Sequence, residues 1–374
     1  MAGNVHRFRG LCRRLVRLRD AIATLVLGAG LAVVGAAVPA QAAAAVPNHW
    51  GFAYVNVPTG IPDPSHQAGS WPAPFKVSVS AGAPGQEFVR FPRIASPGGV
   101  VHVTAVADIA VWCQAQGWFP SGPDEIAVVR CFRPGGAPVF VPFSVTFTQS
   151  STGPFPAGRA YGYVHFSGGI VSQFNSSGAP ITVTPAGTGT WVVHMAGLGS
   201  AGLSGNVQVT AVDPVNPAKC KVAAWKPSPP EQVFLVRCFD KLASPLSTGW
   251  SLSYQRGRAI TGTQPKAFGY TFDNQPLLPG PYAPVPPAVN FNSLAGINTI
   301  RAAGTGLRLV IFPRAGVLPN TVLVTAFGPS ADFCNMLTVW GTAGGQVLVR
   351  DVACYTATGV RQPQASLITY TSAF

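Results

Sequence analysis

The feature that most constrains the fold of this chain is a motif that occurs three times, spaced by the length of a whole domain. In each copy a V-x-V-T-A segment precedes a cysteine, a tryptophan and a second cysteine within a Val-rich run. The three segments are Val101–Ala105, Val207–Ala211 and Val322–Ala326. The period exceeds one hundred residues, which is too long for a propeller blade or a solenoid repeat and typical of a domain.

The composition between these motifs predicts an all-β fold. After the first 42 residues, short runs rich in Val, Ile, Thr and aromatic residues alternate with Gly, Pro, Ser and Asn, and helical periodicity is nearly absent. We therefore expect three tandem β-sandwiches, Ig-like or jelly-roll-like, of seven or eight strands each. Their predicted boundaries are 43–150, 158–257 and 266–374. The strand order, and whether the sandwiches form separate beads or pack about a pseudo-threefold axis, stay open.

The cysteines predict one disulfide in each repeat. In a hairpin, residues that face each other are symmetric about the turn, and the midpoints of the three cysteine pairs are the turn formers Gly122, Pro229 and Gly344. The predicted bridges are Cys113–Cys131, Cys220–Cys238 and Cys334–Cys354. Such bridges are typical of an oxidising compartment. Two thiols without a recurring histidine make an incomplete zinc site, so no metal is expected.

The amino terminus has the pattern of a signal peptide, predicted over residues 1–42. Six arginines precede an apolar segment from Ala21 to Val38, and Ala40-Gln41-Ala42 provides a small-residue cleavage site. The glycines and alanines of the segment make it a poor membrane anchor, so no transmembrane span is expected after cleavage. We expect a secreted, extracellular bacterial protein; export by the general or the twin-arginine route stays open.

The charge of the chain does not suggest a nucleic-acid partner. The 25 basic and 12 acidic residues become 19 and 11 after the predicted cleavage, and the basic residues are scattered singly. A mildly cationic extracellular protein could still adhere to an anionic cell-wall polymer. The oligomeric state cannot be derived from the sequence.

Few residues suggest catalysis. The five histidines after the leader do not recur between repeats, and His102 is expected on the solvent-facing side of its strand. Asp108, Asp213 and Asp332 share one loop of the repeat, but a single carboxylate per loop is a poor calcium site. No cofactor motif is present either. A secreted hydrolase with an atypical site is therefore the alternative to a non-catalytic protein.

Recurring tryptophans are the better candidates for binding. Trp118, Trp225 and Trp340 follow the first cysteine of each repeat. Exposed rings could stack on a polysaccharide, and three copies could bind a polymer with avidity. The alternative is packing beside the disulfide in the sandwich core. The odd spacing of Trp225 from Cys220 favours the first interpretation, and the even spacing of Trp340 from its cysteine favours the second.

The complete repeat signature resembles modules in uncharacterised secreted proteins of high-GC Gram-positive bacteria. It consists of V-x-V-T-A, C-x4-W, a Val-rich run into R-C-F and an aromatic end strand, and the third repeat departs from it at Ala353. The resemblance implies no activity and no site residues. We expect a non-catalytic secreted binding or structural protein, with a ligand-free scaffold of three packed sandwiches as a further alternative.

Overall fold

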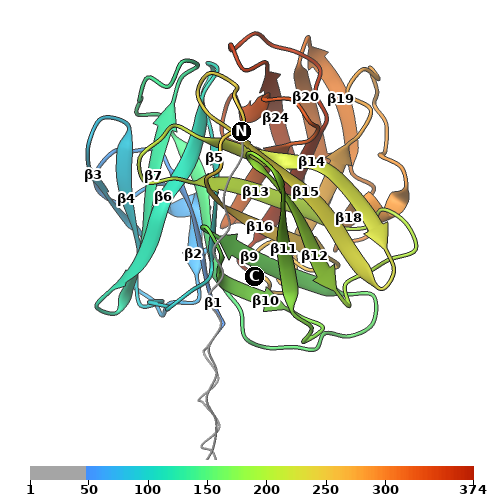
Figure 1. Ribbon diagram of the computed structural model, residues 1–374, viewed down its shortest axis with the longest axis horizontal. Helices are drawn as coiled ribbons and strands as arrows, with labels where there is room; N and C mark the ends of the chain where they lie inside the picture. The colour runs from blue at the N-terminus through green and yellow to red at the C-terminus, as the bar shows by residue number, and fades with distance from the viewer. Residues whose placement is uncertain (1–47) are drawn as a thin grey trace, which may run out of the picture. The chain divides into compact units, whose positions relative to one another are not determined.

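The computed structural model of the chain describes residues 48–374, which belong to one unit (Figure 1). The predicted signal peptide, residues 1–42, lies outside the described residues. The described chain is all-β, as predicted, with two short 3-10 helices. Within it, no helix has the length and hydropathy needed to cross a membrane.

Each repeat forms one set of strands. Repeat 1 contains β1 (His49–Val55), η1 (Pro64–His66), β2 (Gln67–Gly69), β3 (Ser78–Ala81), β4 (Gln86–Phe91), β5 (Val100–Ala105), β6 (Trp112–Ser121), β7 (Asp124–Phe132) and β8 (Phe143–Gln149). Repeat 2 contains β9 (Ala160–Phe166), β10 (Ile170–Asn175), β11 (Ile181–Gly187), β12 (Thr190–Ala196), β13 (Asn206–Val212), β14 (Lys219–Ser228), β15 (Glu231–Phe239) and β16 (Gly249–Arg256). Repeat 3 contains β17 (Phe268–Asp273), η2 (Pro287–Val289), β18 (Asn290–Asn292), β19 (Thr299–Gly304), β20 (Leu307–Phe312), β21 (Asn320–Ala326), β22 (Phe333–Met336), β23 (Gly341–Ala343), β24 (Gln346–Tyr355) and β25 (Ser366–Ser372).

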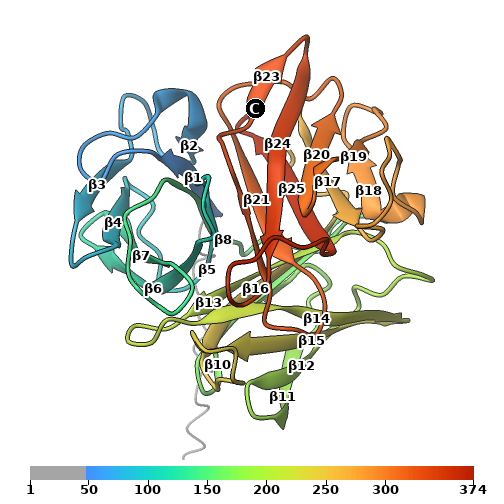
Figure 2. The same ribbon diagram turned by 90° about the horizontal axis from the view of Figure 1, so that it is seen from above.

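The strands of each repeat form two sheets in the same order. The inner sheets, which contain the V-x-V-T-A strands, have the orders β2-β1-β8-β5, β10-β9-β16-β13 and β18-β17-β25-β21. The outer sheets, which contain the cysteines, have the orders β3-β4-β7-β6, β11-β12-β15-β14 and β19-β20-β24-β22, and β23 also pairs with β24. A parallel contact between β13 and β6 joins the inner sheet of repeat 2 and the outer sheet of repeat 1 into one eight-stranded sheet. Figure 2 shows the three repeats as separate lobes, coloured blue to cyan, green to yellow, and orange to red.

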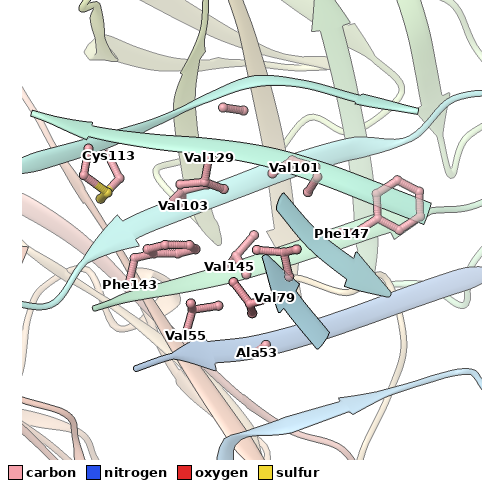
Figure 3. Packing of buried hydrophobic residues seen from close by; sticks show 14 of the residues in the cluster. Ala53, Val55, Val79, Val101, Val103, Cys113, Val129, Phe143, Val145 and Phe147 are labelled. Atoms are coloured by element: carbon pink, nitrogen blue, oxygen red, sulfur yellow. A yellow bond between two sulfur atoms is a disulfide. The ribbon is translucent and has the colours of Figure 1, made fainter. Parts of the chain in front are cut away.

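The core of each sandwich is formed by the apolar faces of its two sheets. In repeat 1, Val101 and Val103 of the inner sheet point towards Val129 of the outer sheet, with Phe143 and Val145 beside them (Figure 3). The valines of V-x-V-T-A are therefore core residues because strand residues two positions apart share one face. Corresponding valines fill the cores of repeats 2 and 3.

The three predicted disulfides are present in the structure. Each joins directly opposed residues of two antiparallel outer strands, with Cα–Cα distances of 4.0, 4.1 and 4.0 Å. The bridges are Cys113–Cys131, Cys220–Cys238 and Cys334–Cys354. Each bridge thus fixes the register of its hairpin.

The other face of each inner sheet packs against a neighbouring repeat. The threonine of each V-x-V-T-A segment bonds the backbone of the preceding such strand in cyclic order: Thr210 Oγ1 accepts from Val103 N at 3.1 Å, and Thr325 Oγ1 accepts from Val209 N at 3.2 Å. Thr104 Oγ1 of repeat 1 accepts from Val324 N of repeat 3, and this bond completes the ring of contacts. The repeats are therefore arranged in a cyclic order about the three V-x-V-T-A strands.

This packing corrects the expected placement of His102. The residue is 3% exposed, and its ring nitrogens lie 2.7 Å from Ser253 Oγ and 3.3 Å from Thr210 Oγ1 of repeat 2. The alternation of side chains along β5 correctly placed His102 on the opposite face from Val101 and Val103, but repeat 2 covers that face. Burial lowers the pKa of His102 to about 3.

A loop clasp joins each neighbouring pair of repeats. The residue after each V-x-V-T-A segment forms a parallel bridge with the first cysteine strand of another repeat, in the pairs Val106–Met336, Val212–Ala115 and Phe327–Val222. The polar residue after the first cysteine binds the same loop. Gln114 Nε2 donates to Asp213 O at 2.7 Å, and Asn335 Nδ2 donates to Ile109 O at 2.8 Å. In the third clasp, Lys221 forms a buried ion pair with Asp332.

Candidate functional site

The predicted ring-stacking surface is wrong for two of its three tryptophans. Trp225 is 7% exposed and packs on Phe234 in the core of repeat 2, and Trp340 is 1% exposed in the core of repeat 3. Their indole nitrogens also bond protein groups, Gln232 Oε1 and Asn320 Oδ1 respectively. A sugar ring cannot reach either indole face.

Trp118 is half-buried at the junction of repeats 1 and 2. Its indole nitrogen donates to Gly98 O at 3.2 Å, and its ring centroid lies 4.3 Å from that of His165. It also packs against the core of repeat 1. The three recurring tryptophans therefore occupy different environments and do not form one repeated surface.

The histidines take part in structural contacts in different parts of the fold. His66 of repeat 1 lies 3.1 Å from Asn320 Oδ1 of repeat 3 and packs on Trp340. His194 Nδ1 lies 3.1 Å from Glu231 Oε1 on neighbouring, part-exposed strand positions. The carboxylate of Asp213, for which cation binding was considered, accepts backbone hydrogen bonds from its own loop.

One position differs between the repeats while its surroundings stay the same. Gly85, Gly189 and Gly306 have φ values of 70°, 62° and 64°, and their carbonyls accept from the second cysteine of each repeat. A Cβ atom at each would lie within 2.8 Å of backbone atoms, so glycine is required there. Two residues later, at the same end of each sandwich, the chain has Glu87, Trp191 and Arg308.

In repeat 3 this sandwich end is closed. Arg308 Nε donates to Asp273 Oδ2 at 2.8 Å, and both side chains are buried. The segment 274–286 covers the pair: Leu278 O accepts from the guanidinium at 2.8 Å, and the hydroxyl of Tyr282 donates to Asp273. The arginine is thus part of a buried ionic network.

In repeat 1 the same end contains a buried carboxyl in a small pocket. Glu87 is 3% exposed, and its Oε2 has no hydrogen-bond partner among the described residues. The pocket, of about 100 Å³, is formed by segments 55–58 and 140–142. Burial raises the pKa of Glu87 to about 7.

In repeat 2 the same end is an open groove of about 650 Å³. The strands β9 and β10 are joined by the tight turn Ser167–Gly169, closed by a 2.8 Å backbone hydrogen bond, where the other repeats have the segments 56–63 and 274–286. The part-buried Phe166 lines the groove, and Trp191, 6% exposed, forms its base against the core of repeat 2, with the two ring centroids 5.8 Å apart. Ile170 forms an exposed part of the wall.

The polar side of this groove is formed by hydroxyl groups and one carboxylate. Thr248 Oγ1 donates to Asp213 Oδ2 at 2.7 Å, and Ser247 Oγ accepts from Gly189 N at 3.1 Å. Both residues line the groove together with Asp213. The groove therefore combines an aromatic wall with fixed hydrogen-bonding groups, as ligand sites commonly do.

This position was not among the predicted site residues because its side chain does not recur between the repeats. Gly189 and Gly306 are equivalent in the aligned repeats, and the residues two positions after them are Trp191 and Arg308. Divergence within an otherwise matched repeat was the available signal. No protein-family model, curated protein or solved structure matches this chain.

Proposed function

We propose that this chain is a non-catalytic secreted binding protein and that the groove of repeat 2 is its ligand site. The observation that supports this function is the open end of the sandwich of repeat 2, which Trp191 and Phe166 line. The equivalent end of repeat 3 is instead filled by Arg308 and its partners. The predicted leader and the three disulfides support a place outside the cytoplasm.

The chemistry of the groove fits a sugar unit of an extracellular polysaccharide or cell-wall polymer. A pyranose has an apolar face that aromatic and aliphatic side chains can contact, here the part-buried Phe166 and the exposed Ile170. Its hydroxyls can bond Ser247 and Thr248 at the polar side. One groove predicts simple one-site binding, without the avidity expected from three equivalent rings.

The test is a pull-down of residues 43–374 with insoluble polysaccharides and purified cell walls at low and high salt. Ile170→Lys places a charge in the groove, and Val171→Lys is the matched control because Val171 is exposed on the same strand outside the groove. We expect salt-resistant retention that falls at least tenfold in Ile170→Lys and persists in Val171→Lys.

Other results would contradict the proposal in distinct ways. Equal loss in both variants would show that charge alone governs retention. Absence of retention on every matrix would reject a polymer ligand. Release of soluble fragments from a retained polymer would identify a hydrolase, the alternative that the sequence left open.

A further inference from the structure

A small cavity lies where the three repeats meet, away from the groove of repeat 2. It has a volume of about 50 Å³ and is lined by equivalent residues from all three V-x-V-T-A strands and by the first cysteine of each repeat. The threonines among them are Thr104, Thr210 and Thr325. A volume of this size can hold a small ion with water, since one water needs about 10–15 Å³ on this measure.

The residue before each first cysteine also lines this axial cavity. These equivalent residues are Trp112, Lys219 and Phe333. The Nζ of Lys219 lies 4.6 Å from the ring centroid of Trp112 and 5.4 Å from that of Phe333. The ammonium of repeat 2 is therefore held between aromatic rings of the other two repeats.

Lys219 is 5% exposed, and no hydrogen-bond acceptor among the described residues bonds its Nζ. The aromatic rings offset part of its charge through cation–π attraction. They leave its three N–H donors without acceptors, which is costly for a buried charged group. The cavity beside the ammonium can hold the missing acceptor.

The charge of the cavity lining favours an anionic acceptor over water alone. Lys221 and Asp332 also line the cavity and pair with each other, so that carboxylate is already neutralised. Lys219 remains as the unbalanced cation of the lining. Burial lowers the pKa of Lys219 to about 8, and the charge of Asp240 opposes this shift. The ammonium is therefore largely charged at neutral pH.

We propose that the axial cavity is a binding site for a small inorganic anion of halide size, with Lys219 Nζ as its hydrogen-bond donor. The anion would accept hydrogen bonds from the N–H groups of Lys219, which have no acceptor among the described residues, and would balance a charge buried at the junction of three repeats. The small volume excludes large organic anions.

Bromide is the probe, because its anomalous scattering identifies it in a crystal. Crystals of residues 43–374 grown in sodium bromide should show an anomalous peak in the axial cavity beside Lys219 Nζ. A peak restricted to exposed surface sites, meaning an adventitious ion only, would overturn the proposal. So would a cavity without anomalous density.

Unfolding in solution gives the second measurement, with sodium chloride compared against sodium gluconate at equal ionic strength. At ten times its dissociation constant, chloride should lower the unfolding equilibrium constant about tenfold. Lys219→Met should remove this difference, whereas Lys226→Met, at an exposed position of the same strand, should retain it. A chloride effect of equal size in both variants would reject Lys219 as the donor. The bromide experiment decides the question if Lys219→Met does not fold.

Discussion

Thr104 Oγ1 accepts a hydrogen bond from the backbone nitrogen of Val324 at 2.9 Å, although 220 positions separate the two residues in the chain. The bond joins the first repeat to the last. Together with the equivalent bonds of Thr210 and Thr325 it makes each inner sheet a contact surface for another repeat. The threonine of V-x-V-T-A recurs because each copy occupies this contact.

Thr104→Val should destabilise the protein by about 1–3 kcal/mol. The substitution preserves the shape of the side chain but leaves the buried Val324 N–H without its acceptor. Chemical denaturation of the variant measures the change. Thr342→Val, on the exposed strand β23, is the control and should shift stability by less than about 0.5 kcal/mol. Equal effects of the two substitutions would contradict this role of Thr104.

Lys221→Met should cost about 3–5 kcal/mol, because it leaves the carboxylate of Asp332 buried without its cation. The double variant Lys221→Met/Asp332→Leu should recover most of this loss, since it removes both charges. Denaturant midpoints of the wild type, Lys221→Met, Asp332→Leu and the double variant form a double-mutant cycle. Additive losses in the double variant would show that the pair does not couple repeats 2 and 3.

The burial of His102 predicts a pH-dependent loss of stability. Its pKa is about 3 in the folded protein, against an ordinary value of 6.5, so only the unfolded state takes up its proton between these values. Stability should therefore fall as pH falls from 6.5 towards 3, by up to about 1.4 kcal/mol per pH unit. His102→Gln, which copies the equivalent Gln208, should reduce this slope. Parallel stability curves for the two proteins would contradict the assignment.

Glu87→Gln should raise the free energy of unfolding at pH 8 by at least about 1 kcal/mol. At pH 4 the free energies of unfolding of variant and wild type should differ little. The folded carboxyl has a pKa of about 7, above its ordinary 4.5, so the folded state holds a proton that the unfolded state has lost between these values. The wild-type protein therefore loses stability as pH rises through that window. A difference between variant and wild type that is constant from pH 4 to pH 8 would disprove this account.

The sandwiches and disulfides could be predicted because their signals are local. Alternation in Val101–Ala105 identified a strand, and the midpoints of the cysteine pairs fell on turn residues, as the registers of Cys113 with Cys131 and Cys220 with Cys238 confirm. Both inferences depend only on strand geometry and on positions close in the sequence.

The interfaces and the groove depend on contacts between distant residues, which one sequence does not reveal. His102 was assigned to solvent because alternation separates two faces without telling what covers the second one. The sheet of repeat 2 that covers His102 has small residues such as Ser251 and Ser253 on its contact face, where a solvated sheet would have charged residues, and this was an available clue. The groove depends on the short Ser167–Gly169 turn, whose importance appears only when the three sandwich ends are compared.

The cyclic order of the clasps gives this protein no terminal repeat. In a linear array the first and last units each expose one unpaired face and need a capping sequence. Here the loop after β5 of repeat 1 contacts repeat 3 through Ala107 N and Met336 O at 2.8 Å, so every repeat contacts both of the others. A fragment with one repeat deleted would expose two complementary faces, and such head-to-tail faces drive self-association into rings or filaments. Loss of a repeat should therefore promote self-association through these two faces.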